Sequence, residues 1–282
     1  MTKSGSVHSA SAPEAWRLVR ARFPFPDYMA HDAGHIEIAK TVMRYLRPGA
    51  RILDFGAGPC DKTAMVAALG YDCTAADDLG DEWHQLGDNR TAILAFAESL
   101  GIRYVQLDGK TLPFEPGTYD MVMLHDVLEH LHNSPRALLI DLLSAVRAEG
   151  YLFVTVPNHV NLRKRLDVLH GRTSLPAYAM YYWYPDPWRG HVREYTRGDC
   201  ERLAEYLDLE IVELRGTHHM LQKVPPRLLR LYEQLSRLAP DVRDTWLFVA
   251  RKRPGWNPKR ALEPDEFRRV TGLRGWLAAG ER

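Results

Sequence analysis

A glycine turn follows an apolar segment early in the chain, and such a turn can receive a nucleoside ligand. Residues 51–55 are mostly apolar and contain Asp54, and the turn Gly56-Ala57-Gly58 comes directly after them. Glycine adopts backbone angles closed to other residues, and it lets a ligand approach the main chain. A second apolar segment, residues 71–76, ends in Asp77, about 20 positions after the first glycine. A carboxylate at this spacing can accept hydrogen bonds from both hydroxyls of a ribose.

Polar residues also end the other apolar segments of this half of the chain. Asp78 follows Asp77, Asp108-Gly109 follow residues 103–107, and His125 follows residues 119–124. The carboxyl ends of neighbouring strands line the ligand crevice of an open α/β sheet. We therefore expect these strand ends to converge on one ligand.

The elements that must position these residues alternate between strands and helices, which predicts a doubly wound α/β fold. Helices are expected where apolar residues recur at helical spacing, at residues 33–46, 92–100 and 134–146. A capped helix is expected at 196–207, and two late strands at 210–214 and 245–250. The last strand should pair in the final hairpin of the sheet.

Composition excludes several classes of protein. The 282 residues include 37 Lys and Arg against 36 Asp and Glu, so no overall charge draws the chain to nucleic acid. The three cysteines, Cys60, Cys73 and Cys200, are widely spaced, which argues against a disulfide framework and a zinc site. No apolar run reaches the roughly 18 residues of a membrane span. The N-terminus lacks a signal core, and we expect a cytoplasmic protein.

Four motifs in order resemble the class I S-adenosylmethionine-dependent methyltransferases of the small-molecule or glycan type. They lie at residues 52–58 (ILDFGAG), 119–130 (YDMVMLHDVLEH), 148–158 (AEGYLFVTVPN) and 190–195 (GHVREY). The resemblance implies a Rossmann-like, mostly parallel, seven-stranded sheet and S-adenosylmethionine as the cofactor. One departure is that the third glycine often found at position 59 or 60 is missing. Because that glycine packs a helix beside a pyrophosphate, its absence weakens a nicotinamide-binding alternative more than a methyl-donor one.

The resemblance also assigns roles to residues at the strand ends. It places Asp54 and the turn Gly56-Ala57-Gly58 at the methionine part, Asp77 at the ribose, Asp78, Asp108 and Gly109 at the adenine, and His125 beside the adenosine. For Asp77 and Asp108 the alternative is ordinary turn chemistry, since aspartate favours loops between strands and helices.

Histidines are the candidate general bases, because a hydroxyl acceptor must lose its proton and an imidazole titrates near neutral pH. His130 follows the fourth strand, and His191 follows an aromatic segment at 178–188. That segment includes Tyr181, Tyr182 and Trp183, and with Arg193 it forms a candidate acceptor wall. The alternative is a packed loop that covers the sheet. No His, Asp and Glu cluster has metal-ligand spacing in the sequence.

The predicted organisation is a disordered tail at 1–12, a methyltransferase domain at 13–251 with a substrate-side insertion at 158–195, and a C-terminal arm at 252–282. The arm would serve as an oligomer contact or a simple tail. In the insertion, the basic run at 163–165 would be a solvated face or contact a phosphorylated acceptor. A helix at 225–238 should turn Leu228, Leu231, Leu235 and Leu238 inward.

The sequence thus predicts an S-adenosylmethionine-dependent methyltransferase acting on the oxygen of a sugar, a polysaccharide precursor or another hydroxylated small molecule. A nicotinamide-dependent oxidoreductase and a non-catalytic, methyltransferase-like binding module are the alternatives. Nucleic acid is not the expected substrate, because no Asn-Pro-Pro-Tyr type motif follows the fourth strand, where the chain has His125-Asp126-Val127-Leu128.

Overall fold

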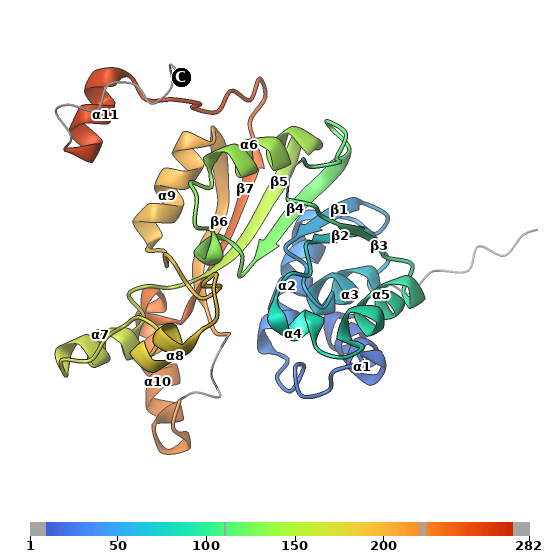
Figure 1. Cartoon of the computed structure of the whole chain (residues 1–282), viewed down its shortest axis with the longest axis horizontal. Helices are drawn as coiled ribbons and strands as arrows, with labels where there is room; N and C mark the ends of the chain where they lie inside the picture. Colours follow the sequence, from blue (N-terminus) through green and yellow to red (C-terminus); the bar gives the residue numbers. More distant parts are fainter. Residues whose placement is uncertain (1–9, 110, 220, 222–223, 273–282) are drawn as a thin grey trace, which may run out of the picture.

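The computed structural model describes residues 10–109, 111–219, 221 and 224–272. Its centre is a seven-stranded sheet with the order β3-β2-β1-β4-β5-β7-β6 (Figure 1). The strands are β1 (Arg51–Phe55), β2 (Asp72–Asp77), β3 (Arg103–Gln106), β4 (Tyr119–His125), β5 (Val146–Pro157), β6 (Leu209–Thr217) and β7 (Thr245–Lys252). β7 runs antiparallel to both β5 and β6, whereas the other neighbours pair in parallel. The predicted mostly parallel α/β sheet with a final hairpin is confirmed.

Helices cover both faces of the sheet, and each face has its own apolar core. One core joins the sheet to α1 (Ala12–Arg22), α2 (Ala33–Tyr45), α3 (Asp61–Ala67) and α5 (Asn89–Ser99). The other joins it to α6 (Arg136–Ala145) and α9 (Arg197–Tyr206). Successive strand residues alternate between the two cores, as Ile52 and Leu53 do on β1, because side chains of a strand point to opposite faces.

The remaining short elements lie in the connections or beyond the sheet. They are α4 (Glu82–Gln85), η1 (Leu128–His130), α7 (Leu162–Leu169), α8 (Tyr178–Trp183), α10 (Pro226–Leu238), η3 (Pro240–Val242) and α11 (Pro264–Thr271). Figure 1 shows α7, α8 and α10 together at one end of the molecule, away from the helices that cover the sheet.

The start of α9 shows why these residues form a helix at that point. Thr196 is the N-cap, and its hydroxyl accepts a hydrogen bond from the Asp199 amide at 3.2 Å. The Asp199 carboxylate in turn accepts a hydrogen bond from the Thr196 amide at 2.8 Å. Such a reciprocal box satisfies amides that have no partner inside the helix. The predicted Thr196 cap is confirmed.

The helix of the insertion begins at Leu162, because the Asn161 side chain accepts from the Lys164 amide and caps it. Within the aromatic segment, α8 forms between the prolines that flank it. One local prediction needs correction. The α10 leucines do not point into a core: Leu228, Leu231, Leu235 and Leu238 are 42–86% exposed.

Parts of the predicted tail and arm, residues 1–9 and 273–282, lie outside the described residues. None of the helices in the described ranges combines the length and apolarity that crossing a bilayer requires.

Candidate functional site

The turn after β1 has the backbone that its sequence requires. Gly56 and Gly58 have φ values of 74° and 48°, in the left-handed region that favours glycine. A Cβ on Gly56 would also lie 2.4 Å from Val127 Cγ2, so this position requires glycine for space as well. Cys60, where a third glycine was expected, has a φ of 69°. The chain therefore keeps the glycine-type conformation at this position with a strained residue.

Asp77 at the end of β2 faces the glycine turn. Its carboxylate accepts hydrogen bonds from the Gly58 amide at 2.9 Å and the Leu79 amide at 2.7 Å. Burial raises the pKa of Asp77 despite these two bonds. Across the turn, the Tyr104 hydroxyl donates to the Gly58 carbonyl at 2.7 Å. The carboxylate and the turn thus form one rigid unit at the sheet edge.

The other strand-end residues lie in different environments. Asp54 is buried, accepts a bond from the Thr63 hydroxyl at 2.6 Å, and has its pKa raised to about 7 by burial. Asp78 accepts from the Gly80 amide at 2.7 Å, and Arg189 approaches its other oxygen at 4.0 Å. Asp108 and Gly109 are exposed beyond β3.

His125 at the end of β4 is buried in its neutral form. Its Nδ1 lies 3.1 Å from the Thr155 hydroxyl, and its Nε2 has no hydrogen-bond partner among the described residues. Burial, and next the charge of Lys62, lowers the pKa of His125 to about 3. The imidazole therefore stays uncharged in the folded protein at neutral pH.

This burial predicts a dependence of stability on pH. Between pH 6.5 and about 3 the unfolded chain protonates His125 while the folded chain does not. The stability is therefore complete above pH 6.5 and falls as the pH drops, by at most about 1.4 kcal/mol per pH unit. Urea unfolding of the wild type and His125→Gln from pH 4 to 8 measures this, and the wild type should show the steeper loss. Parallel curves would contradict a buried neutral imidazole.

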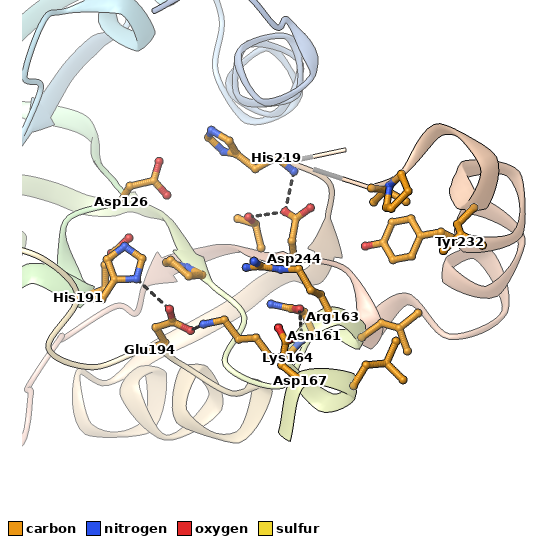
Figure 2. Close-up of a pocket in the computed structure, with 18 of the residues that line it drawn as sticks. Asp126, Asn161, Arg163, Lys164, Asp167, His191, Glu194, His219, Tyr232 and Asp244 are labelled. Carbon is orange, nitrogen blue, oxygen red and sulfur yellow. Dashed lines mark hydrogen bonds and ion pairs between the residues drawn. The ribbon is translucent and has the colours of Figure 1, made fainter. Parts of the chain in front are cut away.

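A cavity of about 850 Å³ opens beside these strand ends (Figure 2). Its polar lining comes from η1, from the loop before α9, from the start of α3 and from the charged residues of α7, and its apolar lining comes mainly from the leucines of α7 and α10. The polar wall includes Lys62, Asp126, His130, His191 and Glu194. The cavity can hold a small organic molecule with one polar and one apolar side.

Two histidines in this wall have a fixed tautomer. His191 Nδ1 lies 2.8 Å from Glu194 Oε1, and His130 Nδ1 lies 2.6 Å from the carbonyl oxygen of Arg189. Both oxygens can only accept, so each Nδ1 carries a proton, and in a neutral ring the lone pair is therefore on Nε2. The two rings meet edge to face with centroids 5.0 Å apart. Predicted from separate motifs, His130 and His191 therefore meet in one place.

Glu194 holds His191 and is itself held by Lys164. The buried Lys164 ammonium forms an ion pair with Glu194 Oε2, on the carboxylate whose other oxygen contacts His191 (Figure 2). The sequence left two roles open for the basic run, a solvated face or a contact with a phosphorylated acceptor. Lys164, its middle residue, takes neither role, because it is buried and paired with Glu194. The charge of Glu194 stabilises the imidazolium form of His191.

Glu129 is fully buried, and neither of its carboxylate oxygens has a hydrogen-bond partner within the described residues. Burial, and next the charge of Asp126, raises its pKa to about 8, so the group is mainly protonated at neutral pH. Glu129, His130 and His191 each bring one ligand atom within 4.8 Å of the others, and this trio could hold a metal ion. Sequence spacing could not reveal it, because His191 lies in a different segment.

Two ion pairs close the cavity near the glycine turn. His35 Nε2 lies 2.5 Å from Asp61 Oδ2 in a buried contact, and Lys62 Nζ lies 2.9 Å from Asp126 Oδ2. Although burial opposes it, the charge of Asp126 raises the pKa of Lys62. Asp126 has a φ of 59°, a strained conformation for a residue other than glycine. Strain held at a cavity wall is typical of functional sites.

The four predicted acceptor residues do not reach this cavity. Within the described part of the chain, its lining excludes Tyr181, Tyr182, Trp183 and Arg193. The three aromatic side chains are exposed on α8, and Arg193 pairs with Asp199 at 3.0 Å. The aromatic segment therefore does not line this cavity, and its role as an acceptor wall stays a prediction.

Comparison with known proteins decides the family. Residues 29–214 match the family described as a methyltransferase domain. The chain belongs to this methyltransferase family. The finding supports the predicted class I S-adenosylmethionine-dependent methyltransferase over the oxidoreductase and the non-catalytic module.

Relatives and solved structures agree with this assignment. Over 195 residues the chain is 26% identical to the ubiquinone biosynthesis O-methyltransferase of Burkholderia multivorans. The matched stretch covers 68% of this chain and 79% of the relative. The fold of this chain is similar to a putative methyltransferase from Bacillus halodurans, with a TM-score of 0.51, 18% identity and coverage of 77% and 99%. The fold is also similar to that of a Burkholderia thailandensis 1,6-didemethyltoxoflavin-N1-methyltransferase with bound S-adenosylhomocysteine, with a TM-score of 0.50 and 18% identity. This match covers 90% of this chain and 93% of the other.

The glycine turn of this methyltransferase fits S-adenosylmethionine, its cofactor. A Cβ on Gly58 would lie 3.6 Å from the His84 ring, and the Gly58 amide and carbonyl are bonded to Asp77 and Tyr104. The Asp77 carboxylate stands beside that amide, and a Cβ on Gly109 would meet no atom within 4 Å. An acidic group beside open main chain suits a nucleoside without phosphates.

Sequence analysis missed several residues of the methyltransferase cavity. Glu194 follows His191 in the chain and was not proposed to orient it, although that short spacing was a usable signal. Lys62 and Asp126 are 64 positions apart, and His35 and Asp61 are 26 apart. No local pattern links such pairs, since only the tertiary fold brings them together.

Proposed function

We propose that this methyltransferase transfers a methyl group to a hydroxyl oxygen of a small acceptor bound in the cavity. The observation that carries the proposal is the pair His130 and His191, each with Nδ1 engaged, in a cavity wall beside the end of β4. A hydroxyl acceptor needs a base, and an oriented imidazole is a suitable one.

For the donor, we propose the assignments that the family resemblance implied. Asp77 would hold the ribose hydroxyls, and the Gly56-Ala57-Gly58 main chain would hold the methionine part. Asp78, Asp108, Gly109 and His125 would border the adenosine. Asp54 would act through Thr63 rather than by contact, because it is buried below the turn and bonded to that hydroxyl.

S-adenosylmethionine supplies an activated methyl group on a sulfonium, so the protein mainly orients the acceptor and removes its proton. His191 Nε2 accepts the hydroxyl proton, and the carboxylate of Glu194 stabilises the imidazolium that forms. His130 meets the His191 ring edge to face and limits its rotation. Lys164 in turn fixes Glu194 through their buried ion pair.

The acceptor class follows from the two walls of the cavity. The polar wall suits a hydroxylated ring, whereas Leu166, Leu228, Leu231 and Leu235 suit an attached apolar group. We propose a sugar, a polysaccharide precursor or a similar hydroxylated molecule that carries an apolar portion. The names of the curated relatives, which are O-methyltransferases, support transfer to oxygen.

The experiment is a screen with methyl-labelled S-adenosylmethionine against nucleotide sugars, lipid-linked sugars, phenols and matched amines. Label should enter the hydroxylated acceptors as methyl ethers, with S-adenosylhomocysteine released in equal amount. Label in the amines alone would reject oxygen as the target. A repeat after EDTA treatment should give the same turnover. A loss that Mn²⁺ restores would instead make the Glu129, His130 and His191 trio a metal site.

A further inference from the structure

Large apolar side chains are exposed at one end of the molecule, on α7, α8 and α10. We call six of them the apolar rim: Leu169, Tyr178, Tyr182, Trp183, Leu231 and Leu238. Leu169, Trp183 and Leu238 are 80%, 79% and 86% exposed. α8 buries none of its residues, although four of its six are aromatic. Figure 1 shows the three helices projecting together from the body of the fold. An exposed apolar surface of this kind marks an interaction site.

The same helices concentrate positive charge. Exposed arginines lie on or beside α7 and α10, at positions Arg163, Arg165, Arg172, Arg227, Arg230 and Arg237. The acidic residues of these two segments, Asp167 and Glu233, are only half exposed. The whole chain has nearly equal numbers of both charges, so the basic excess is local to this end.

We propose that α7, α8 and α10 dock on the surface of a lipid bilayer that contains anionic lipids. Tyrosine and tryptophan prefer the level of the headgroups, because their rings are apolar and their tips are polar. Amphipathic helices with arginines on the polar side bind such surfaces by apolar burial and by attraction to phosphates. Each arginine near the surface adds to the attraction.

Charge distinguishes the bilayer from a second copy of the chain. A symmetric dimer through this surface would bring two sets of arginines together, and like charges at an interface disfavour association. An anionic bilayer meets the apolar rim and the arginines at once. The cavity wall from α7 and α10 would then lie near the lipid, but the docking does not depend on the proposed acceptor.

The test is flotation of the full chain with phosphatidylcholine vesicles, with and without phosphatidylglycerol. Binding should require phosphatidylglycerol and weaken with salt, because the attraction is screened. Leu169→Ser/Trp183→Ser should reduce the bound fraction at least about tenfold, because it removes two apolar side chains that the bilayer would bury. The matched control, Leu18→Ser/Val270→Ser, changes exposed apolar residues of α1 and α11 and should bind like the wild type.

Donor binding provides the control for folding, since neither double variant touches the glycine turn. Unchanged S-adenosylhomocysteine affinity with lost flotation supports the docking surface. The proposal is overturned if the wild type binds neither vesicle, or if the rim variant floats as well as the control. It is also overturned if ultracentrifugation shows a dimer that the rim variant dissociates, since the surface would then join two copies.

Discussion

Replacing His191 with alanine is expected to lower kcat by about 10²–10⁴-fold, the usual contribution of a positioned general base. The reason is that His191 lines the cavity and Glu194 holds its Nδ1, which orients the ring to act as a base. The Kd for S-adenosylhomocysteine should not change, because the glycine turn and Asp77 lie outside the cavity lining. Single-turnover rates with an acceptor from the screen, and calorimetry of donor binding, measure the two quantities.

The variant Glu194→Gln tests whether Glu194 acts on the base His191 or only stabilises the fold. Glutamine can still accept from His191 Nδ1, but it no longer stabilises the imidazolium, so the acidic limb of the kcat/KM profile should move to lower pH. His132→Ala is the matched control, since His132 is an exposed histidine that bonds the Trp188 carbonyl and does not line the cavity. Wild-type kcat in both His191→Ala and His130→Ala would remove the histidines from the mechanism.

The sheet and the glycine turn were predictable because their signals are local. An apolar strand, a Gly-x-Gly turn and a helix are consecutive in the chain, and the acid at the end of β2 has a fixed spacing from them. The turn even keeps its geometry where the expected glycine is absent, since Cys60 adopts a φ of 69°. Local steric demands of this kind can be read in one segment.

The cavity was less predictable because its contacts join distant segments. Lys164 was predicted as part of a basic face, yet its partner Glu194 lies 30 positions away. Glu129 is buried, and neither of its carboxyl oxygens has a hydrogen-bond partner among the described residues. Neither outcome follows from residue type alone, since both depend on which loop crosses the end of β4.

The α10 leucines show a further limit of periodicity. Their helical spacing correctly predicts an amphipathic helix, but a period identifies the apolar face and not what covers it. Here the face borders the cavity and the solvent instead of a core. An apolar stripe on a helix can therefore be assigned to the core only when another element of the fold covers it. A stripe that stays uncovered indicates a surface that binds a ligand or a partner.

Replacing Asp77 with alanine is expected to weaken donor binding by roughly 10–150-fold, from about 1.5–3 kcal/mol for a hydrogen bond to a charged group. The carboxylate would bind the ribose hydroxyls, and it also orders the turn through the Gly58 and Leu79 amides. With saturating donor, kcat should change much less, because Asp77 is not part of the cavity lining. Calorimetry with S-adenosylhomocysteine gives the Kd.

Two further variants show whether the loss comes from the ribose contact or from a disordered turn. Asp77→Asn keeps an oxygen for one amide but loses the charge and the second acceptor, so its Kd should fall between wild type and alanine. Asp72→Ala removes an exposed carboxylate at the other end of β2 and should leave the Kd unchanged. If Asp77→Ala stays folded in thermal melts and binds the donor like the wild type, the ribose lies elsewhere. The prediction that the strand ends converge on a nucleoside would then fail for Asp77, the residue on which it chiefly depends.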